Sequence, residues 1–345
     1  MAEVQPRHID LAICLDTSNS MDGLIDSAKQ KLWAIVNELA TARPRPLLRV
    51  GLYQYGNNGL KRDVGWVQKV CDLTDDLDTV YGKLFGLTTN GGTEYVARVI
   101  RAATEELSWN ADRGTLRIIF VAGNEPATQD REWKLQDICS AAAGKGIIVN
   151  TIFCGREQEG RRTGWADGRY AFIDQDRGTV AVNTPFDKRL TELGAKLNTT
   201  YVAYGNGGGG GRANQALQDS NALKAGAPAA AERAAAKSTL LYRNAGWDLV
   251  DAVRDKKVDL AKLKDEELPE PMRKMTPEQR KEYVEKQLAE RARIQKEIQD
   301  LNAKRQAHVK AEMEKQGLSE AKAFDAALRA AIRAQAEAKN FTFEK

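Results

Sequence analysis

A short apolar run near the N-terminus ends abruptly in oxygen-bearing side chains. Residues 9–15 are largely apolar and contain no glycine or proline, so they are predicted to form a buried parallel strand. Asp16, Ser18 and Ser20 follow at alternate positions, ahead of a helix. Ligand sites in open α/β sheets lie at such carboxyl ends of strands. Because all three side chains offer only oxygen donors, the sequence predicts a site for a hard divalent cation such as Mg²⁺.

The same residues carry a resemblance to a known family. The stretch Asp-Thr-Ser-Asn-Ser at 16–20 resembles the DxSxS signature of von Willebrand factor type A domains, whose metal-ion-dependent adhesion site binds a divalent cation. Farther along, Gly91-Gly92-Thr93 resembles the second metal loop of that family, whose threonine contributes a hydroxyl ligand. The resemblance implies Mg²⁺ or Mn²⁺ at a site made of four ligands: Asp16, Ser18, Ser20 and Thr93. The simpler structural alternative is a loop whose hydroxyl and carboxylate groups bond only to backbone donors.

The chain departs from the family pattern at residues 116–126, a predicted central strand and its exit loop. The family has Thr-Asp-Gly-x-Pro there, and its aspartate completes the metal site. Alignment on Val121 and Pro126 places Gly123 at the aspartate position, so one carboxylate is lost. This loss weakens resting metal affinity but increases the attraction of the ion for an acidic partner. The candidates for a substitute ligand are Asn124, Glu125, Glu94 and Asp22. For each of them an ordinary exposed charge or polar group at a loop or helix terminus is the simpler interpretation.

The first two hundred residues alternate between strand and helix patterns. This predicts an α/β fold with a doubly wound, mostly parallel sheet and an antiparallel edge strand. The predicted strands after the first are 47–55, 62–71 (the edge), 116–121, 147–153 and 169–173. The predicted helices are 27–41, 75–85, 95–107, 131–143 and 185–197, with 155–168 as an irregular segment. The resemblance covers about residues 7–204, the predicted von Willebrand factor type A domain.

The composition changes after the first two hundred residues. Residues 205–212 are rich in glycine and predicted to be a flexible linker. Residues 213–345 are rich in Ala, Lys, Glu, Arg and Gln and predicted to be an α-helical region. The predicted helices are 213–225, 229–243, 246–263, 277–316 and 319–339. In the long fourth helix, Arg305 and His308 interrupt an apolar seam, so a sustained coiled coil is not expected.

Composition and charge exclude several functional classes. The net charge is +4 over 345 residues, and acids and bases are interspersed. This pattern is not typical of proteins that bind nucleic acids, which carry clustered basic residues. No apolar run is long enough to span a bilayer. Because no signal peptide precedes the first strand, the sequence as written predicts a cytoplasmic protein; a chain trimmed of its leader would be periplasmic or secreted.

The residues typical of enzymes are scarce. The two histidines, His8 and His308, are far apart in the sequence, and no Ser/His/Asp or Cys/His arrangement is visible. The four cysteines have no metal-type spacing and are expected to be free thiols. A Cys139–Cys154 bridge is disfavoured because the predicted helix and strand carry the two residues apart by more than the ~7 Å that a disulfide spans.

Together these features predict a non-enzymatic protein-interaction module. Its metal loops, 16–20 and 91–93, would contact an acidic group of a protein partner. Similar bacterial proteins pair such domains with helical appendages that engage complexes or the envelope, which is analogy at the level of fold. The alternative is a scaffolding protein with a vestigial metal site, whose C-terminal helices carry the interactions.

Overall fold

The chain divides into two compact units in a computed structural model that describes residues 7–154, 169–173, 182–316 and 324–343. The first, here called the sheet unit, comprises Met1–Ala181 together with Gly317–Lys345. The second, the helical unit, is Val182–Gln316. The chain therefore leaves the sheet unit, forms the helical unit and returns. This division differs from the predicted boundaries at 204 and 213.

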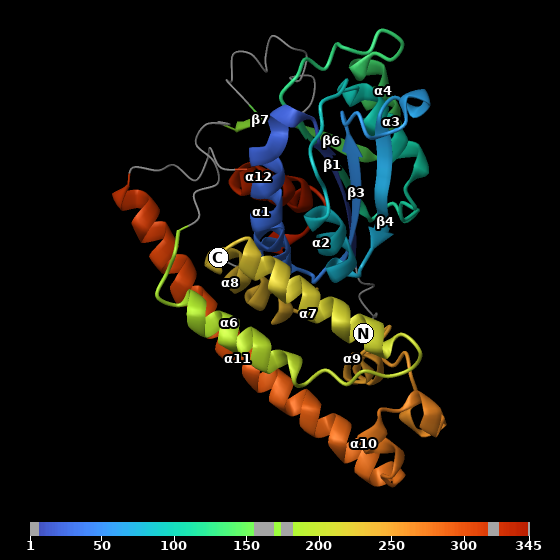
Figure 1. Cartoon of the computed structure of the whole chain (residues 1–345), viewed down its shortest axis with the longest axis vertical. Coiled ribbons are helices and arrows are strands. Elements are labelled where there is room, and N and C mark those ends of the chain that lie inside the picture. The colour runs from blue at the N-terminus through green and yellow to red at the C-terminus, as the bar shows by residue number, and fades with distance from the viewer. Residues whose placement is uncertain (1–6, 155–168, 174–181, 317–323, 344–345) are drawn as a thin grey trace. The chain divides into compact units, whose positions relative to one another are not determined.

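A six-stranded sheet organises the sheet unit, with the order β4-β3-β1-β5-β6-β7 (Figure 1). All neighbouring pairs are parallel except β3 with β4, which is antiparallel and lies at the edge. This confirms the predicted fold class. The strands are β1 (His8–Asp16), β3 (Leu47–Tyr55), β4 (Val67–Thr74), β5 (Leu116–Gly123), β6 (Ile147–Cys154) and β7 (Arg169–Ile173).

Helices cover both faces of this sheet (Figure 1). Side chains alternate along a strand, so β1 contributes to two cores. Its residue Cys14 belongs to a buried cluster with α3 and α4, whereas Ile13 and Leu15 line a small void together with residues of α1 and α2. The helices are α1 (Asp22–Ala40), α2 (Leu77–Phe85), α3 (Val96–Glu106) and α4 (Leu135–Gly144).

The edge strand begins later than predicted. Residues 62–71 were expected to be extended, but Arg62–Val64 form a 3-10 turn and the strand starts at Val67. Gly65 and Trp66 both adopt left-handed backbone conformations, with φ values of 72° and 53°. The chain therefore turns at these two residues before the strand begins. The irregular segment predicted at 155–168 lies outside the described residues.

The C-terminal tail belongs to the sheet unit, which corrects the prediction of one helical region from 213 to 345. Helix α12 (Phe324–Glu337) packs against α1, where Arg333 Nε donates to Glu38 Oε1 at 2.9 Å. Buried Gln335 and Asn150 of β6 exchange amide hydrogen bonds of 2.5 and 3.3 Å. Strand β8 (Thr342–Phe343) then pairs with β2 (Ala42–Arg43). The first residues of the helix predicted at 319–339 lie outside the described residues.

The helical unit contains no glycine linker at the predicted place. Residues 208–211 form the first turn of α7 (Gly208–Lys224) instead. A Cβ at Gly211 would lie 2.2 Å from Trp247 Cγ, so this glycine allows close packing rather than flexibility. The other helices are α6 (Asp187–Asn198), α8 (Ala227–Lys237), α9 (Leu249–Arg254), α10 (Glu270–Arg273) and α11 (Pro277–Lys315). Helix α6, predicted as the last helix of the sheet domain, thus lies in the helical unit.

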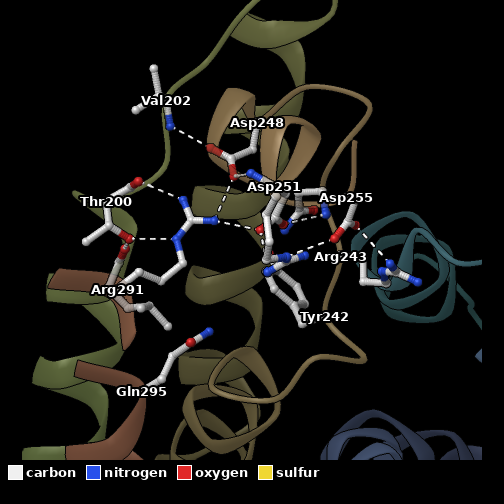
Figure 2. Close-up of polar contacts among 12 residues, drawn as sticks. Thr200, Val202, Tyr242, Arg243, Asp248, Asp251, Asp255, Arg291 and Gln295 are labelled. Atoms are coloured by element: carbon white, nitrogen blue, oxygen red, sulfur yellow. Dashed lines mark hydrogen bonds and ion pairs between the residues drawn. The ribbon is translucent and has the colours of Figure 1, made fainter. Parts of the chain in front are cut away.

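Two arginines are buried among the apolar residues on the inner face of the 39-residue helix α11. Figure 2 shows Arg291, whose Nη1 donates to Asp248 Oδ2 at 2.7 Å and to Asp251 Oδ1 at 2.8 Å. Its Nη2 donates to the Thr200 carbonyl at 2.7 Å. Arg305 is likewise buried, with Nε 2.7 Å from Asp187 Oδ1. Because each buried guanidinium meets carboxylates, these ion pairs connect α11 with the rest of the helical unit.

Two further predictions can be compared with the structure. None of the four cysteines is paired in a disulfide, as expected. Among the described residues no helix is both long and apolar enough to cross a bilayer.

Candidate metal site

The predicted metal loop lies where the winding of the sheet changes direction. Strands β1 and β5 are adjacent and parallel, and the chain continues from β1 toward β3 on one side and from β5 toward β6 on the other. Asp16 is the last residue of β1, and Gly123 is the last residue of β5. Such a switch point at the carboxyl ends of strands is where open α/β sheets bind ligands.

Asp16 is fully buried, and one of its two carboxylate oxygens has a protein partner. The backbone N–H of Ser18 donates to Oδ1 at 2.8 Å. Oδ2 is buried and meets no hydrogen-bond donor among the described residues. Burial raises the pKa of Asp16 to about 7, against the effect of the Ser18 bond and with a further increase from nearby Glu94. A buried carboxylate oxygen without a donor is costly for a folded protein unless a cation or another ligand compensates it.

The two serine hydroxyls lie side by side. Ser18 Oγ and Ser20 Oγ are 3.1 Å apart, and Ser20 Oγ donates to Asn124 Oδ1 at 3.1 Å. Asn124 directly follows Gly123, so the exit loop of β5 brings a neutral amide oxygen to the place where the family has a carboxylate. The structure therefore joins Asp16, Ser18 and Ser20 and adds Asn124, which the sequence offered only as one of several substitutes.

Backbone and amide contacts hold the second predicted loop against the first. The N–H of Asn90 donates to the Thr17 carbonyl at 3.0 Å, and Asn57 Nδ2 donates to the Thr88 carbonyl at 2.9 Å. A Cβ at Gly92 would lie 2.2 Å from the Gly56 carbonyl oxygen, so only glycine permits this approach. Thr93 follows it and is half-buried. Its position on this loop fits the predicted ligand role, which stays a prediction.

Glu94, the next residue, is buried beside Asp16 rather than exposed. A Cβ at Gly56 would lie 2.7 Å from Asp16 Oδ1 and 2.8 Å from Glu94 Cγ, so both acidic side chains pack against this glycine. Gln129 Nε2 donates to Glu94 Oε2 at 3.0 Å. Burial raises the pKa of Glu94; the Gln129 bond opposes this increase, and the charge of Glu125 adds to it.

The other proposed substitutes differ in their placement. Asp22, at the start of α1, accepts a hydrogen bond from the Thr89 hydroxyl. Glu125 is half-buried after Asn124, and its charge contributes to the raised pKa of Asp16. Within the described part of the chain, no three His, Cys, Asp or Glu side chains are grouped closely enough to hold a metal ion. A cation here would consequently depend on hydroxyl and amide oxygens as well as on carboxylates, a donor set that fits Mg²⁺ or Mn²⁺.

The comparison with protein families agrees with this geometry. Residues 11–125 match the family model described as the von Willebrand factor type A domain. The sheet unit therefore contains a von Willebrand factor type A domain, as the DxSxS resemblance predicted. Domains of this family often mediate protein–protein interaction. No curated protein is significantly similar to the chain.

The solved structures that resemble the chain share low sequence identity with it. Proximal thread matrix protein 1 from the mussel byssus is 12% identical with a TM-score of 0.36, and the match covers 50% of this chain and 43% of that one. The SpRpn10 VWA domain is 16% identical with a TM-score of 0.38, covering 48% and 88% respectively. The pilus adhesin SpaC from Lactobacillus rhamnosus GG is 14% identical with a TM-score of 0.38, covering 49% and 28%. The chain thus spans less than half of the mussel protein and of the adhesin.

Proposed function

We propose that this protein is a non-enzymatic interaction module that binds an acidic group of a protein partner through a divalent cation. Asp16, Ser18, Ser20 and Thr93 would hold Mg²⁺ or Mn²⁺. The bound ion supplies a positive charge and open coordination positions at the end of the sheet. The observation that carries the proposal is that Asp16 Oδ2 is buried without a donor among the described residues. It has none although the Ser18 and Ser20 hydroxyls belong to the same loop.

The chemistry of the donors supports an acidic partner. Neutral hydroxyl and amide oxygens leave most of the charge of a divalent cation uncompensated. A carboxylate from a partner is then a strong additional ligand, since it supplies both an oxygen and a negative charge. The family membership of the sheet unit supports a protein partner.

Calorimetric titration with Mg²⁺ and Mn²⁺ tests the metal site. We expect saturable binding to the wild type, loss of binding in Asp16→Ala and tighter binding in Gly123→Asp. Asp26→Asn is a matched control, because it removes an exposed acid of α1 and should bind as the wild type does. If the wild type binds neither ion while Gly123→Asp does, the site is vestigial and the proposal is wrong; the interactions would then depend on the helices.

Dependence of partner binding on the metal tests the second part. A partner captured by the wild type in Mg²⁺ should be released by EDTA and should not be captured by Asp16→Ala. Methylation of the partner's carboxylates should have the same effect as EDTA. Capture that is unaffected by EDTA would favour the scaffolding alternative.

A further inference from the structure

We infer that Glu94 supplies the second negative charge of the metal site, which the chain lacks at Gly123. This inference rests on the proposed function, since it concerns the same ion. The family pattern takes this carboxylate from the exit loop of β5; here it would come from the loop before α3. The charge is therefore moved from one side of the site to the other rather than lost.

The burial of Glu94 needs an explanation that its protein contacts do not give. Its exposed fraction is 7%, and the side chains described as hydrogen-bonding to it, Gln129 and Ser18, are both neutral. No ion pair with an arginine or lysine is described for it, unlike the buried acids of the helical unit. A buried carboxylate without a cationic partner is costly, and a second one beside it increases that cost.

Asp16 and Glu94 together point to a cation. Asp16 Oδ1 and Glu94 Cγ would lie 2.7 and 2.8 Å from a Cβ at Gly56, so the two side chains pack close together there. The other oxygen of Asp16, Oδ2, is buried and has no donor among the described residues. Gly56 combines a positive φ of 75° with the absence of a side chain, and any Cβ there would collide with both acids. A divalent cation near this point would neutralise the two carboxylates at once.

The position of Glu94 is fixed before any ion binds. Gln129 Nε2 donates to its carboxylate, and Gln129 Oε1 accepts from the Glu94 backbone N–H at 3.3 Å. This paired contact holds both the backbone and the side chain. Residues that orient a ligand in this way contribute to metal affinity without touching the ion.

The inference changes what the site offers to a partner. With Asp16 and Glu94 both charged, the protein supplies two negative charges to a divalent ion. The bound site is then neutral before any partner arrives, so an incoming carboxylate would be attracted less strongly than at a site with one acid. Removal of the Glu94 charge should therefore weaken metal binding. At the same time, added acetate should bind more tightly to the metal-loaded site.

Calorimetry with Mn²⁺ on four variants tests this inference. Glu94→Gln keeps the shape and the bond from Gln129 but removes the charge, so we expect Mn²⁺ affinity to fall about tenfold or more. Adding Gly123→Asp to Glu94→Gln should restore it to within about threefold. Glu105→Gln removes an exposed charge from α3, the helix that follows Glu94, and should leave affinity unchanged, whereas Asp16→Asn should abolish binding.

The thermal melting temperature without metal gives a second readout and reports folding. Glu94→Gln should melt at a higher temperature than the wild type in EDTA, because it removes one of two adjacent buried charges, and Mn²⁺ should raise its melting temperature less. Unchanged Mn²⁺ affinity in Glu94→Gln, with binding lost in Asp16→Asn, would overturn the role of Glu94 and leave the proposed function standing. Absence of Mn²⁺ binding in the wild type would instead overturn the proposed function. If Glu94→Gln does not fold, Glu94→Asp decides: it keeps the charge and should still bind Mn²⁺.

Discussion

The two units treat buried carboxylates in opposite ways. In the helical unit, Asp248 and Asp251 lie against Arg291, and Asp187 lies against Arg305. At the carboxyl end of β1 in the sheet unit, Asp16 and Glu94 both pack against Gly56, and no basic side chain is described between them. Buried charges that are already paired serve the fold, whereas buried charges of one sign that gather at a switch point favour a cation from solution. The difference therefore separates a structural network from a candidate binding site.

The largest effect should come from breaking a completed network. Arg291→Met would leave Asp248 buried without its cation and Asp251 with Arg254 alone, and we expect a loss of about 3–5 kcal/mol in the free energy of unfolding. Urea denaturation followed by circular dichroism measures it. A loss below about 1 kcal/mol would mean that these acids do not depend on Arg291.

Removing the Asp16 charge at the end of β1 should increase the free energy of unfolding instead of lowering it. The pKa of Asp16 is raised from its ordinary 3.8 to about 7, and each tenfold change in proton affinity corresponds to about 1.4 kcal/mol. In EDTA at pH 8, Asp16→Asn should therefore be more stable than the wild type by about 2–4 kcal/mol.

The pH dependence of that gain checks its cause. Well below pH 3.8 the Asp16 carboxyl is protonated in both the folded and the unfolded chain, so the gain should vanish. As the pH rises toward 7 the unfolded chain releases the proton first, and the wild type loses stability that Asp16→Asn keeps. A gain that is equal at pH 4 and pH 8 would contradict an electrostatic origin.

An acid with cationic partners should show the reverse dependence. Asp219 of α7 contacts Arg233 and Lys237 at 2.5 and 2.9 Å, and its pKa is lowered to about 2 although burial alone would raise it. Asp219→Asn should cost about 2 kcal/mol at pH 7. Since this stability is present above the unfolded pKa and is lost as the pH falls through about 2, the difference from the wild type should shrink between pH 4 and pH 2. A difference that stays constant over this range would argue against the ion pairs.

The smallest effect should come from an exposed pair. Arg293 Nη2 lies 2.7 Å from Glu290 Oε1 on the surface of α11. Arg293→Gln should leave the urea midpoint unchanged, because water screens such pairs. It is the matched control for Arg291→Met, since both residues lie on the same helix. A clear shift of the midpoint would show that an exposed ion pair of α11 also contributes to stability, contrary to this comparison.

The metal loop shows how far sequence reasoning extends. A buried strand followed by Asp16, Ser18 and Ser20 located the site, because alternation and turn signals are local. The loop residues 91–93 were found by their resemblance to the second metal loop of the family. Glu94 was considered but interpreted as an ordinary exposed charge, because the residues next to it in the sequence do not reveal its contact with Gly56. Its burial arises from contacts with residues far away in the sequence, Gly56 and Gln129 among them.

The sequence by itself determined the elements and their type. The strands and helices of the sheet unit follow mainly from apolar periodicity, which acts over a few residues. Only the tertiary structure decided which elements belong together. Gly208 begins a helix, and α6 belongs to the helical unit. Helix α12 contacts α1 and β6, although the whole helical unit separates it from them in the sequence. The physical reason is that an amphipathic helix specifies which face it buries but not the partner that covers it, and the partner is chosen by long-range packing.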